Sequence, residues 1–356
     1  MPKQALCIRI SKNEGQQTIV LTSKLGLFDK SLEIKRDKTS LCIPIIRQPD
    51  AAELAKLKAE APDFQLETTT ISEKRIHAET LSQAIQNKVP SQLLESLPQA
   101  LDIIGDIAIV EIPTELVPYQ NFIGQAILST HRNVKTVLAK AGAISGTYRV
   151  RNLTFIAGEN KTRTIHKEFG CQYHVDVARA YFSPRLSHEH ERVASLVQAG
   201  ETVTDLFAGV GPFSVLIGKR IPNVKVYAVD LNPDAFELLK VNVRVNRVEN
   251  RVFPILADAR QISKDKLKGV ANRVIMNLPE TAIEFIDAAS QAIKSEGGLV
   301  HFYAFVRSPD SIEDLKYRFC KAVEVSGRRV ETFLYAKSIR ETAPFESQVV
   351  LDAKIV

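Results

Sequence analysis

The sequence contains few cysteines, and their spacing does not fit a disulfide framework or a zinc site. Its four cysteines lie far apart in the 356 residues, and no two form a Cys-x-x-Cys pair. This spacing argues against both a structural zinc site and a set of disulfides. We expect reduced and mostly buried thiols at Cys7, Cys42, Cys171 and Cys320.

Long apolar runs are also missing. No stretch is long enough to cross a bilayer, and the N-terminus lacks the apolar core of a signal peptide. We therefore expect a cytoplasmic protein without membrane contact. The chain has no internal repeat or low-complexity tract, and its 45% hydrophobic composition is ample for two or three packed domains.

The histidines show no metal-binding spacing. His166, His174, His188 and His190 are close in sequence, but no zinc pattern relates them and no cysteine accompanies them. We expect ordinary surface or hydrogen-bonded roles and no obligatory metal.

The net charge of +6 is unevenly distributed. Residues 1–60 hold eleven Lys and Arg against seven Asp and Glu, and residues 120–192 hold eleven against five, so the remainder is net acidic. Basic surface concentrated in two segments is the pattern expected for a polyanion such as RNA, although a merely solvated basic face would look the same.

Local patterns predict a small α+β module, a linker and a second α+β unit. The module is expected to contain a strand over Ala5–Ile10, a helix over Gly15–Leu25, and strands over Leu32–Lys35 and Ser40–Ile46. Residues 47–75 resemble a helix-containing linker. The second unit is expected to contain a helix over Ser82–Leu97 interrupted by Pro90, a strand over Asp106–Glu111, a helix over Tyr119–Ser129, and strands over Val134–Leu138, Gly146–Arg151, Leu153–Gly158, Thr162–Phe169 and Cys171–Asp176.

A glycine turn then follows a buried strand. Glu201–Phe207 reads as the strand, Ala208–Gly211 breaks it, and Pro212–Arg220 reads as a helix. Two glycines let the backbone approach a ligand, and a helix N-terminus presents free N–H groups. Asp230 ends the next apolar run, where a carboxylate can accept both hydroxyls of a ribose.

Two kinds of cofactor share these features. A dinucleotide fingerprint needs Gly or Ala where this sequence has Ser214, which leaves the choice open. Arg273–Met276 runs into Asn277-Leu-Pro279, and an amide with carbonyls held by proline suits a nitrogen-bearing planar substrate better than hydride transfer. This favours S-adenosylmethionine over a nicotinamide.

The remaining segments extend the same domain. Asp258 follows a third apolar strand and is expected to receive the adenine amine, to cap a helix, or both. A strand over Leu299–Phe305 follows Gly297-Gly298. Segments near Ala322–Ser326, Thr332–Tyr335 and Ser347–Ile355 are expected to complete a sheet with an antiparallel end.

Several motifs together resemble one family over essentially the full chain, the archaeal and eukaryotic tRNA (guanine-37 N1)-methyltransferases. They are Ile104-Gly-Asp-Ile-Ala108, Gly146-Thr-Tyr-Arg149, Tyr181-Phe-Ser-Pro-Arg-Leu-Ser-His-Glu-His190, Asp205-Leu-Phe-Ala-Gly-Val-Gly-Pro-Phe213, Asp230-Leu-Asn-Pro233 and Asn277-Leu-Pro279. The resemblance implies an α/β fold: a Rossmann-like class I methyltransferase domain with a mainly parallel seven-stranded sheet over residues 186–356. It also implies a small N-terminal α+β tRNA-binding domain (1–65) and a middle α+β RNA-binding domain (70–185) that contributes to tRNA binding and the active site.

The resemblance also assigns site residues. S-adenosyl-L-methionine is the expected cofactor, tRNA the expected partner, and a monomer the expected state. The expected substrate-binding residues are Tyr181, Pro279, Arg151 and Arg185. The cofactor contacts are Asp205, Phe207, Ala208, Gly209, Gly211, Phe213, Asp230, Leu231, Asn232, Asp258, Ala259 and Asn277.

Catalysis at guanine N1 requires removal of a proton and stabilisation of negative charge on O6. By resemblance Glu189 is the general base, with Glu191 as its rival. Either glutamate could instead stabilise the N-terminus of a helix through its negative charge in the first turn, with Ser187 as the cap of that helix. Arg149 would stabilise O6, because a guanidinium stays protonated, and Asn277 would bind the guanine edge.

Three functions remain open. The first is N1 methylation of the guanosine 3′ of the anticodon, whose base must be flipped into the pocket. The second is aminocarboxypropyl transfer from the same cofactor, or additional methylation of a wyosine precursor, at the same tRNA position. The third is a tRNA-binding module without catalysis.

Overall fold

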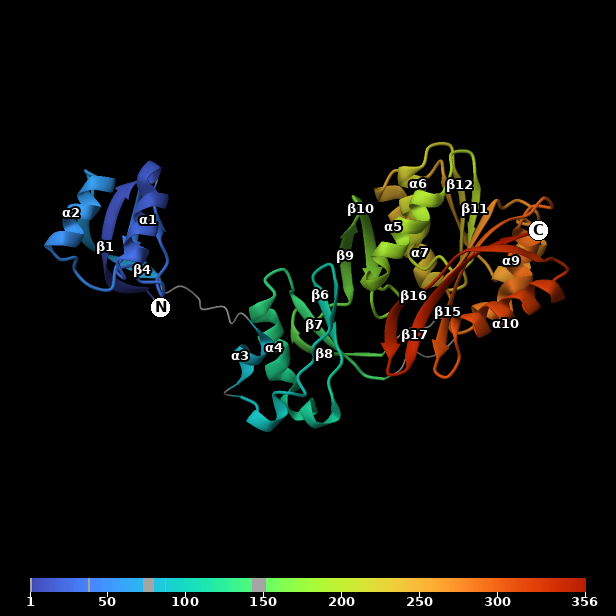
Figure 1. Cartoon of the computed structure of the whole chain (residues 1–356), viewed down its shortest axis with the longest axis horizontal. Helices are drawn as coiled ribbons and strands as arrows, with labels where there is room; N and C mark the ends of the chain where they lie inside the picture. Colours follow the sequence, from blue (N-terminus) through green and yellow to red (C-terminus); the bar gives the residue numbers. More distant parts are fainter. Residues whose placement is uncertain (1, 38, 73–79, 87, 143–151) are drawn as a thin grey trace. The chain divides into compact units, whose positions relative to one another are not determined.

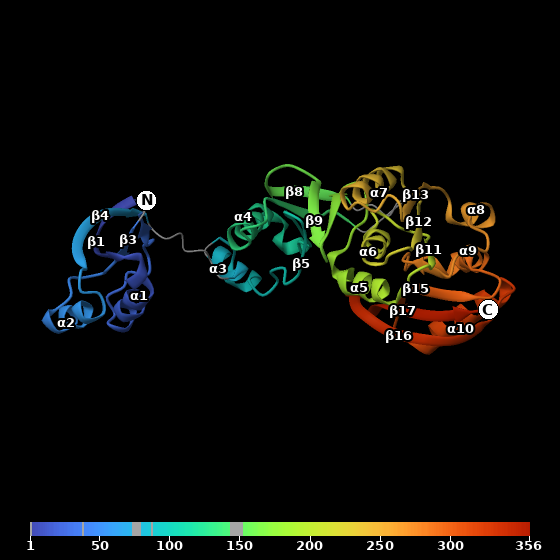
Figure 2. The same cartoon turned by 90° about the horizontal axis from the view of Figure 1, so that it is seen from above.

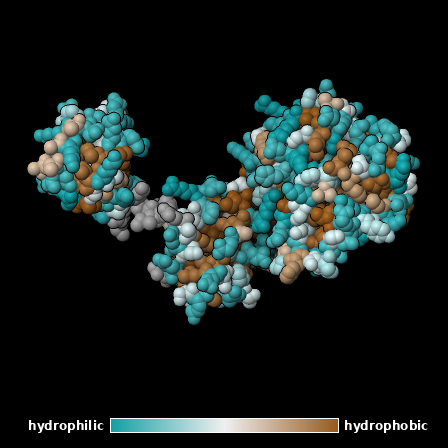
Figure 3. All heavy atoms as spheres, in the orientation of Figure 1, coloured by the Kyte–Doolittle hydropathy of each residue, from teal (hydrophilic) through white to brown (hydrophobic). Residues whose placement is uncertain are grey.

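The computed structural model describes residues 2–37, 39–72, 80–86, 88–142 and 152–356. The chain divides into two compact units, Met1–Glu79 and Thr80–Val356 (Figure 1). The predicted boundary near residue 185, inside the larger unit, stays a prediction. On the face drawn in Figure 3, hydrophilic residues cover most of each unit and hydrophobic residues form smaller patches.

The first unit is an antiparallel sheet of order β2-β3-β1-β4 with two helices. Its elements are β1 (Pro2–Ser11), α1 (Gly15–Lys24), β2 (Lys35–Arg36), β3 (Ser40–Pro44), α2 (Ala51–Glu60) and β4 (Gln65–Ser72). The linker prediction for residues 47–75 is therefore wrong, because β4 pairs with β1 along eight residues. The polar, Thr-rich β4 misled the prediction: it is an edge strand and most of its side chains are not buried. The strand predicted over Leu32–Lys35 is shorter and begins only at Lys35.

The second unit begins with a four-stranded sheet of order β5-β6-β7-β8. Its elements are α3 (Leu81–Ile85), β5 (Leu101–Ile104), β6 (Ile107–Val110), α4 (Gln120–Thr130), β7 (Thr136–Lys140) and β8 (Leu153–Gly158). The helix predicted over Ser82–Leu97 is wrong beyond Ile85, since Pro90 leaves only a 3-10 turn (η2, Ser91–Leu93). The strand predicted over Gly146–Arg151 lies outside the described residues.

A two-stranded hairpin, β9 (Arg163–Glu168) and β10 (Cys171–Asp176), follows this sheet. Two buried asparagines fix it in place, Asn242 of helix α7 (Pro233–Val245) and Asn246, which directly follows that helix. The Asn242 amide donates to the carbonyl of His174 and accepts from its N–H, and Asn246 does the same at Gln172. These bonds satisfy the free backbone groups of the hairpin edge and hold it against the larger sheet.

That sheet has seven strands in the order β13-β12-β11-β14-β15-β17-β16. The first five strands run parallel to one another, β17 runs antiparallel to β15, and β16 pairs antiparallel with β17, which confirms the predicted α/β fold. The strands are β11 (Thr202–Asp205), β12 (Lys225–Asp230), β13 (Val252–Leu256), β14 (Arg273–Met276), β15 (Gly298–Arg307), β16 (Val330–Ala343) and β17 (Glu346–Ile355).

Helices cover both faces of this sheet (Figures 1 and 2). One buried cluster joins the sheet to α5 (Ser187–Leu196), α6 (Pro212–Arg220) and α7, and a second joins it to α9 (Ile286–Ala292) and α10 (Ile312–Val325). The strand predicted near Ala322–Ser326 is wrong, because these residues end α10. Buried Leu315, Phe319 and Val323 recur at helical spacing and override the local alternation of Ala-Val-Glu-Val.

Candidate active site

A cavity of about 380 Å³ opens beside the carboxyl ends of β11, β12 and β14. Ligands of open α/β sheets bind at this edge. Twelve of the predicted site residues line the cavity: Tyr181, Phe207, Ala208, Gly209, Phe213, Asp230, Leu231, Asn232, Asp258, Ala259, Asn277 and Pro279.

The glycine turn bends sharply between β11 and α6. Gly209 (φ 55°) and Gly211 (φ 91°) both adopt the left-handed conformation that favours glycine. A Cβ on Gly211 would also lie 2.4 Å from the Leu239 side chain, so this glycine packs against α7 and does not line the cavity. Helix α6 then starts with Pro212 in its first turn.

Asp230 joins the turn to the end of β12. Its carboxylate accepts from the N–H of Gly209 at 2.6 Å and from the N–H of Asn232 at 2.8 Å. Burial raises the pKa of Asp230, and these backbone hydrogen bonds oppose the rise. The carboxylate thus fixes the loop while also facing the cavity, where ribose hydroxyls could donate to it.

Two helix caps shape the same wall. The Asn232 side chain accepts from the N–H of Asp234 and caps α7. Asp258 caps α8 (Ala259–Lys264), with one carboxylate oxygen accepting from the N–H groups of Arg260 and Gln261. The capping alternative for Asp258 is therefore confirmed, and because both bonds use Oδ1, its cavity-facing role remains compatible with the cap.

Asp205 lies beneath the turn and outside the cavity lining. It is completely buried, and Ser214 donates to its Oδ2 at 2.7 Å. Its Oδ1 has no hydrogen-bond partner among the described residues. Burial raises its pKa to about 7, although the bond from Ser214 acts in the opposite direction. Ser214 stands where a dinucleotide fingerprint needs Gly or Ala. In the structure its hydroxyl has a structural role, as a hydrogen-bond donor to Asp205.

The substrate side of the cavity carries a polar atom that lacks a partner. Asn277 Oδ1 is buried and makes no hydrogen bond within the described part of the chain. The backbone carbonyl of Pro279, two residues later, accepts a hydrogen bond from the N–H of Phe305 and so holds this segment against β15. A buried unsatisfied acceptor facing a cavity is expected where a ligand supplies the donor.

Five of the predicted site residues besides Asp205 do not line the cavity or cannot be placed. Gly211 and Glu189 are not among the lining residues, although their chain neighbours Pro212 and His190 are, and Arg185 forms an ion pair with Asp102 of β5. Arg149 and Arg151 lie outside the described residues.

Glu189 belongs to a buried charge network on α5. Its carboxylate accepts from the Tyr303 hydroxyl at 2.9 Å and from the Arg192 guanidinium at 2.8 to 3.1 Å. Arg192 also donates to Asp352, which His301 bonds from the other side at 2.6 Å. Burial works to lower the pKa of Arg192, but its hydrogen bonds with Glu189 and Asp352 raise it.

Glu191 faces a different direction. It is partly exposed and pairs with Arg220 of α6 at 2.7 Å. The structure therefore separates the two glutamates that the sequence left as rivals. The predicted cap at Ser187 is wrong: Leu186 occupies the cap position, no side chain caps α5, and Ser187 is already helical.

Several polar residues of the cavity wall were not predicted from the sequence, and two of them, His190 and Gln348, are almost completely buried. His190 is 1% exposed, and its Nδ1 lies 2.7 Å from Glu168 of β9. Burial works to raise the pKa of Glu168, but hydrogen bonds with His166 and His190 lower it to about 2. Gln348 of β17 is also 1% exposed and accepts from Arg340. A lone glutamine at the start of an apolar strand was the available signal.

Family models match three parts of the chain. The TRM5/TYW2 methyltransferase domain matches residues 164–330, the TYW2 N-terminal domain matches residues 81–162, and the tRNA methyltransferase 5 N-terminal domain matches residues 7–53.

Curated relatives match along their length. The tRNA (guanine(37)-N(1))-methyltransferase Trm5b of Pyrococcus abyssi is 38% identical over 98% of this chain and 99% of its own. The enzyme of the same name from Methanocaldococcus jannaschii is 35% identical over 98% of each chain. The tRNA 4-demethylwyosine(37)-methyltransferase Taw21 of Saccharolobus solfataricus is 34% identical over 71% of this chain and 93% of its own.

Solved structures of proteins with these names are also similar to this chain. A complex of aTrm5 with tRNALeu has a TM-score of 0.75 at 35% identity, covering 99% of this chain and 100% of that one. M. jannaschii Trm5 with adenosine has a TM-score of 0.63 at 34% identity, covering 98% and 99%. M. jannaschii TYW2 with AdoMet has a TM-score of 0.55 at 29% identity, covering 72% and 99%. The chain belongs to the TRM5/TYW2 methyltransferase family, alongside the tRNA (guanine(37)-N(1))-methyltransferases that it matches from end to end.

Proposed function

We propose that the protein transfers a methyl group from S-adenosylmethionine to N1 of guanosine 37 in tRNA. The observation that carries the proposal is the cavity where the glycine turn, Asp230 and the unpaired Asn277 amide oxygen meet. Near full-length identity to enzymes named for this reaction supports the choice of substrate. Bound S-adenosylmethionine would supply an electrophilic methyl group, which needs no metal.

The donor set of the cavity fits this cofactor. The Asp230 carboxylate can accept from ribose hydroxyls, and Asp258 and Ala259, which line the same cavity, would hold the adenine. Phe207 closes this end of the cavity through an edge contact with Phe285. Asp205 would support the turn from below.

Guanine N1 carries a proton that must leave before the nitrogen can attack. We assign its removal to Glu189, by resemblance to the family's catalytic glutamate; Arg192 and Tyr303 donate to its carboxylate, and its neighbour on α5, His190, lines the cavity. To take the N1 proton, the Glu189 carboxylate has to turn away from Arg192 when guanosine binds. Glu191 is the poorer candidate because its side chain is 40% exposed and pairs with Arg220 of α6, whereas that of Glu189 is 7% exposed.

The remaining roles follow the family pattern. Arg149 would stabilise the negative charge on O6, as a guanidinium can. Asn277 would bind the guanine edge, while Tyr181 and Pro279 hold the faces of the base. Tyr181 is 40% exposed, which leaves its ring available for stacking.

The partner would be tRNA, with residue 37 flipped out of the anticodon loop. A monomer, independence from metals and a cytoplasmic location complete the proposal. Among the described residues, no group of side chains could hold a metal ion, and no helix is long and apolar enough to cross a membrane.

A second activity has one specific support. Taw21, a wyosine-precursor methyltransferase by name, covers 71% of this chain at 34% identity. Methylation of a tricyclic precursor at position 37 is therefore kept as an added activity. Aminocarboxypropyl transfer from the same cofactor remains the other alternative.

Labelled donors distinguish these reactions. Purified protein is mixed with S-adenosylmethionine labelled either in the methyl group or in the carboxyl carbon, and with tRNA transcripts carrying G or A at position 37. We expect methyl label alone to enter the G37 transcript. Transfer of the carboxyl label would favour the aminocarboxypropyl reaction, and no transfer of either label would overturn the proposal.

A further inference from the structure

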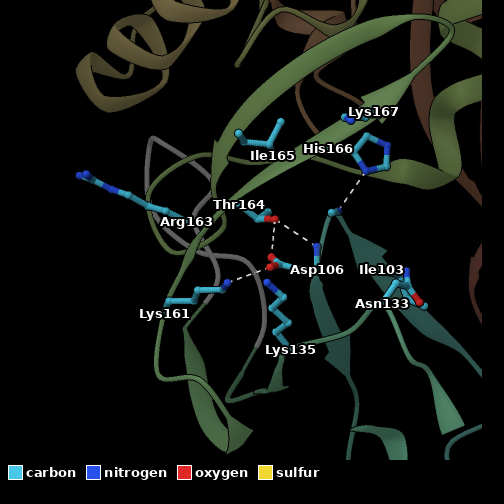
Figure 4. Close-up of a pocket in the computed structure, with 11 residues that line it drawn as sticks. Ile103, Asp106, Asn133, Lys135, Lys161, Arg163, Thr164, Ile165, His166 and Lys167 are labelled. Atoms are coloured by element: carbon cyan, nitrogen blue, oxygen red, sulfur yellow. Dashed lines mark hydrogen bonds and ion pairs between the residues drawn. The ribbon is translucent and has the colours of Figure 1, made fainter.

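A second cavity, of about 710 Å³, lies in the second unit between β9 and the sheet that contains β5 and β7 (Figure 4). None of the residues that line it lines the cavity described above. Among the described residues, its lining contains four cationic side chains, Lys135, Lys161, Arg163 and Lys167, and one carboxylate, that of Asp106.

The floor of this cavity is a fixed structure. The turn at Gly105 and Asp106 is bonded to β9 by three hydrogen bonds. The N–H of Gly105 donates to His166 Nδ1 at 3.2 Å, the N–H of Asp106 donates to Thr164 Oγ1 at 3.1 Å, and that hydroxyl donates to the Asp106 carboxylate at 2.7 Å. Gly105 adopts φ 57°, and a Cβ there would lie 2.2 Å from Thr164 Oγ1. The turn therefore seats tightly against the strand.

Among the described residues of the lining, the one carboxylate is already paired with a cation. Asp106 accepts from Lys161 Nζ at 2.8 Å, as Figure 4 shows, and Lys161 also pairs with Glu159. Arg163 contacts Asp176 through Nε at 3.2 Å, yet its side chain is 79% exposed, and Figure 4 shows it extending away from Asp106.

Two lysines remain for a ligand. Lys135 and Lys167 are exposed, and within the described part of the chain neither has an ion-pair partner. With Arg163, whose Nε also contacts Asp176, they give the described part of the rim three cations, and the carboxylate there, that of Asp106, is paired with Lys161. Such a rim attracts phosphate oxygens, and an exposed guanidinium can donate to them in pairs.

The position of the cavity bears on its ligand. Strand β9 supplies Thr164 and His166 to the basic cavity, and its last residue, Glu168, bonds His190 of the first cavity. Glu168 Oε2 also lies 3.6 Å from His166 Nε2. One short strand therefore connects the two cavities, and a polyanion held in one would lie near the other.

We propose that the cavity rimmed by Lys135, Arg163 and Lys167 binds a backbone phosphodiester of the RNA substrate. The proposal rests on the proposed function for the identity of that RNA. The site contributes binding and register but no chemistry, so its loss acts on affinity and not on the turnover of bound substrate.

The test is the double charge reversal Lys135→Glu with Lys167→Glu. Its matched control is Lys266→Glu with Lys268→Glu, two exposed lysines in the connection before β14. Binding of tRNA is measured from low to high salt. We expect the first variant to raise Kd and KM by at least tenfold with kcat within about twofold of wild type. The slope of log K against log salt should fall by about one to two.

Unchanged thermal unfolding and S-adenosylmethionine binding establish that the variant is folded. Kd and salt slope equal to those of the control variant would overturn the proposal. Inorganic phosphate, tested without tRNA at constant ionic strength, should not raise the Tm of the wild type. A rise that the double variant abolishes, with tRNA binding unaffected, would mark a site for free phosphate and also overturn it.

This outcome is separable from the main proposal. A wild-type protein that methylates G37 while the double variant binds tRNA normally leaves the proposed function intact and removes the inference. A protein that binds tRNA through these lysines but transfers no methyl group keeps the inference and contradicts the proposed function.

Discussion

Arg192 holds both carboxylate oxygens of Glu189 from one turn further along α5, at 2.8 to 3.1 Å. A neutral glutamine at position 189 would keep the size of the side chain but could not accept the N1 proton. We expect Glu189→Gln to lower kcat by about 10²- to 10⁴-fold, the usual contribution of a general base. Single-turnover methylation measures this, with cofactor and tRNA binding retained.

The matched control is Glu191→Gln. This residue pairs with Arg220 on the surface of α5, so its variant should keep nearly full activity. If Glu191→Gln is the inactive variant and Glu189→Gln turns over normally, the assignment of the base is wrong.

Arg192 itself compensates two buried carboxylates, Glu189 and Asp352. Arg192→Met would remove the guanidinium while keeping much of the apolar volume against Tyr335. Breaking a buried pair from one side costs about 3 to 5 kcal/mol, because the partner charge stays buried. Urea unfolding should show a loss near the lower figure, since Arg192 is 21% exposed. An unchanged midpoint would contradict the network.

Asp205 gives the free protein a specific pH dependence. Its pKa in the folded state is about 7, against an ordinary value of 3.8. Because the folded state holds this proton more tightly, the contribution to stability is full below about pH 4 and is lost as the pH rises through 7. Three pKa units correspond to roughly 4 kcal/mol.

The comparison that isolates this effect is the unfolding free energy of wild type minus that of Asp205→Asn, measured at several pH values without cofactor. Asparagine can still accept from Ser214 but does not titrate. We expect the difference to fall between pH 4 and 7 and to stay level above pH 8. A difference that is constant with pH would show that the pKa of Asp205 is the same in the folded and unfolded states.

Asp258 separates a structural role from a binding role. Asparagine is as good a helix cap as aspartate, whereas alanine costs about 1 kcal/mol at such a position. Asp258→Asn should keep the wild-type Tm and weaken S-adenosylmethionine binding, and Asp258→Ala should impair both. Binding of S-adenosylmethionine is measured by calorimetric titration. If Asp258→Asn binds it with wild-type affinity, Asp258 acts only as a helix cap.

Much of the larger sheet could be predicted from the sequence. Strand β14 and helix α6 begin and end where the apolar runs do, and the left-handed glycines stand where the turn was expected. Short buried strands flanked by glycine or proline give strong local signals. The same reasoning failed at β4 and at the end of α10, where pairing and packing with distant residues decide the structure.

The site divides in the same way. Asp230 and Asn277 could be predicted because they follow strands whose ends meet at one edge. His190 and Gln348 could not, since their importance depends on Glu168 and Arg340, which come from other strands. The pairing of Glu189 with Arg192 and Tyr303 is likewise a tertiary property, because Tyr303 lies 114 residues further along the chain.

The position of the transferred methyl group tests the central claim most directly. A G37 transcript is incubated with the protein and S-adenosylmethionine, digested to nucleosides, and analysed by mass spectrometry beside primer extension across the anticodon loop. The account predicts N1-methylguanosine and a reverse-transcription stop at residue 37, both absent from the A37 transcript. A methyl group on another atom or residue, or an unmodified G37, would contradict it.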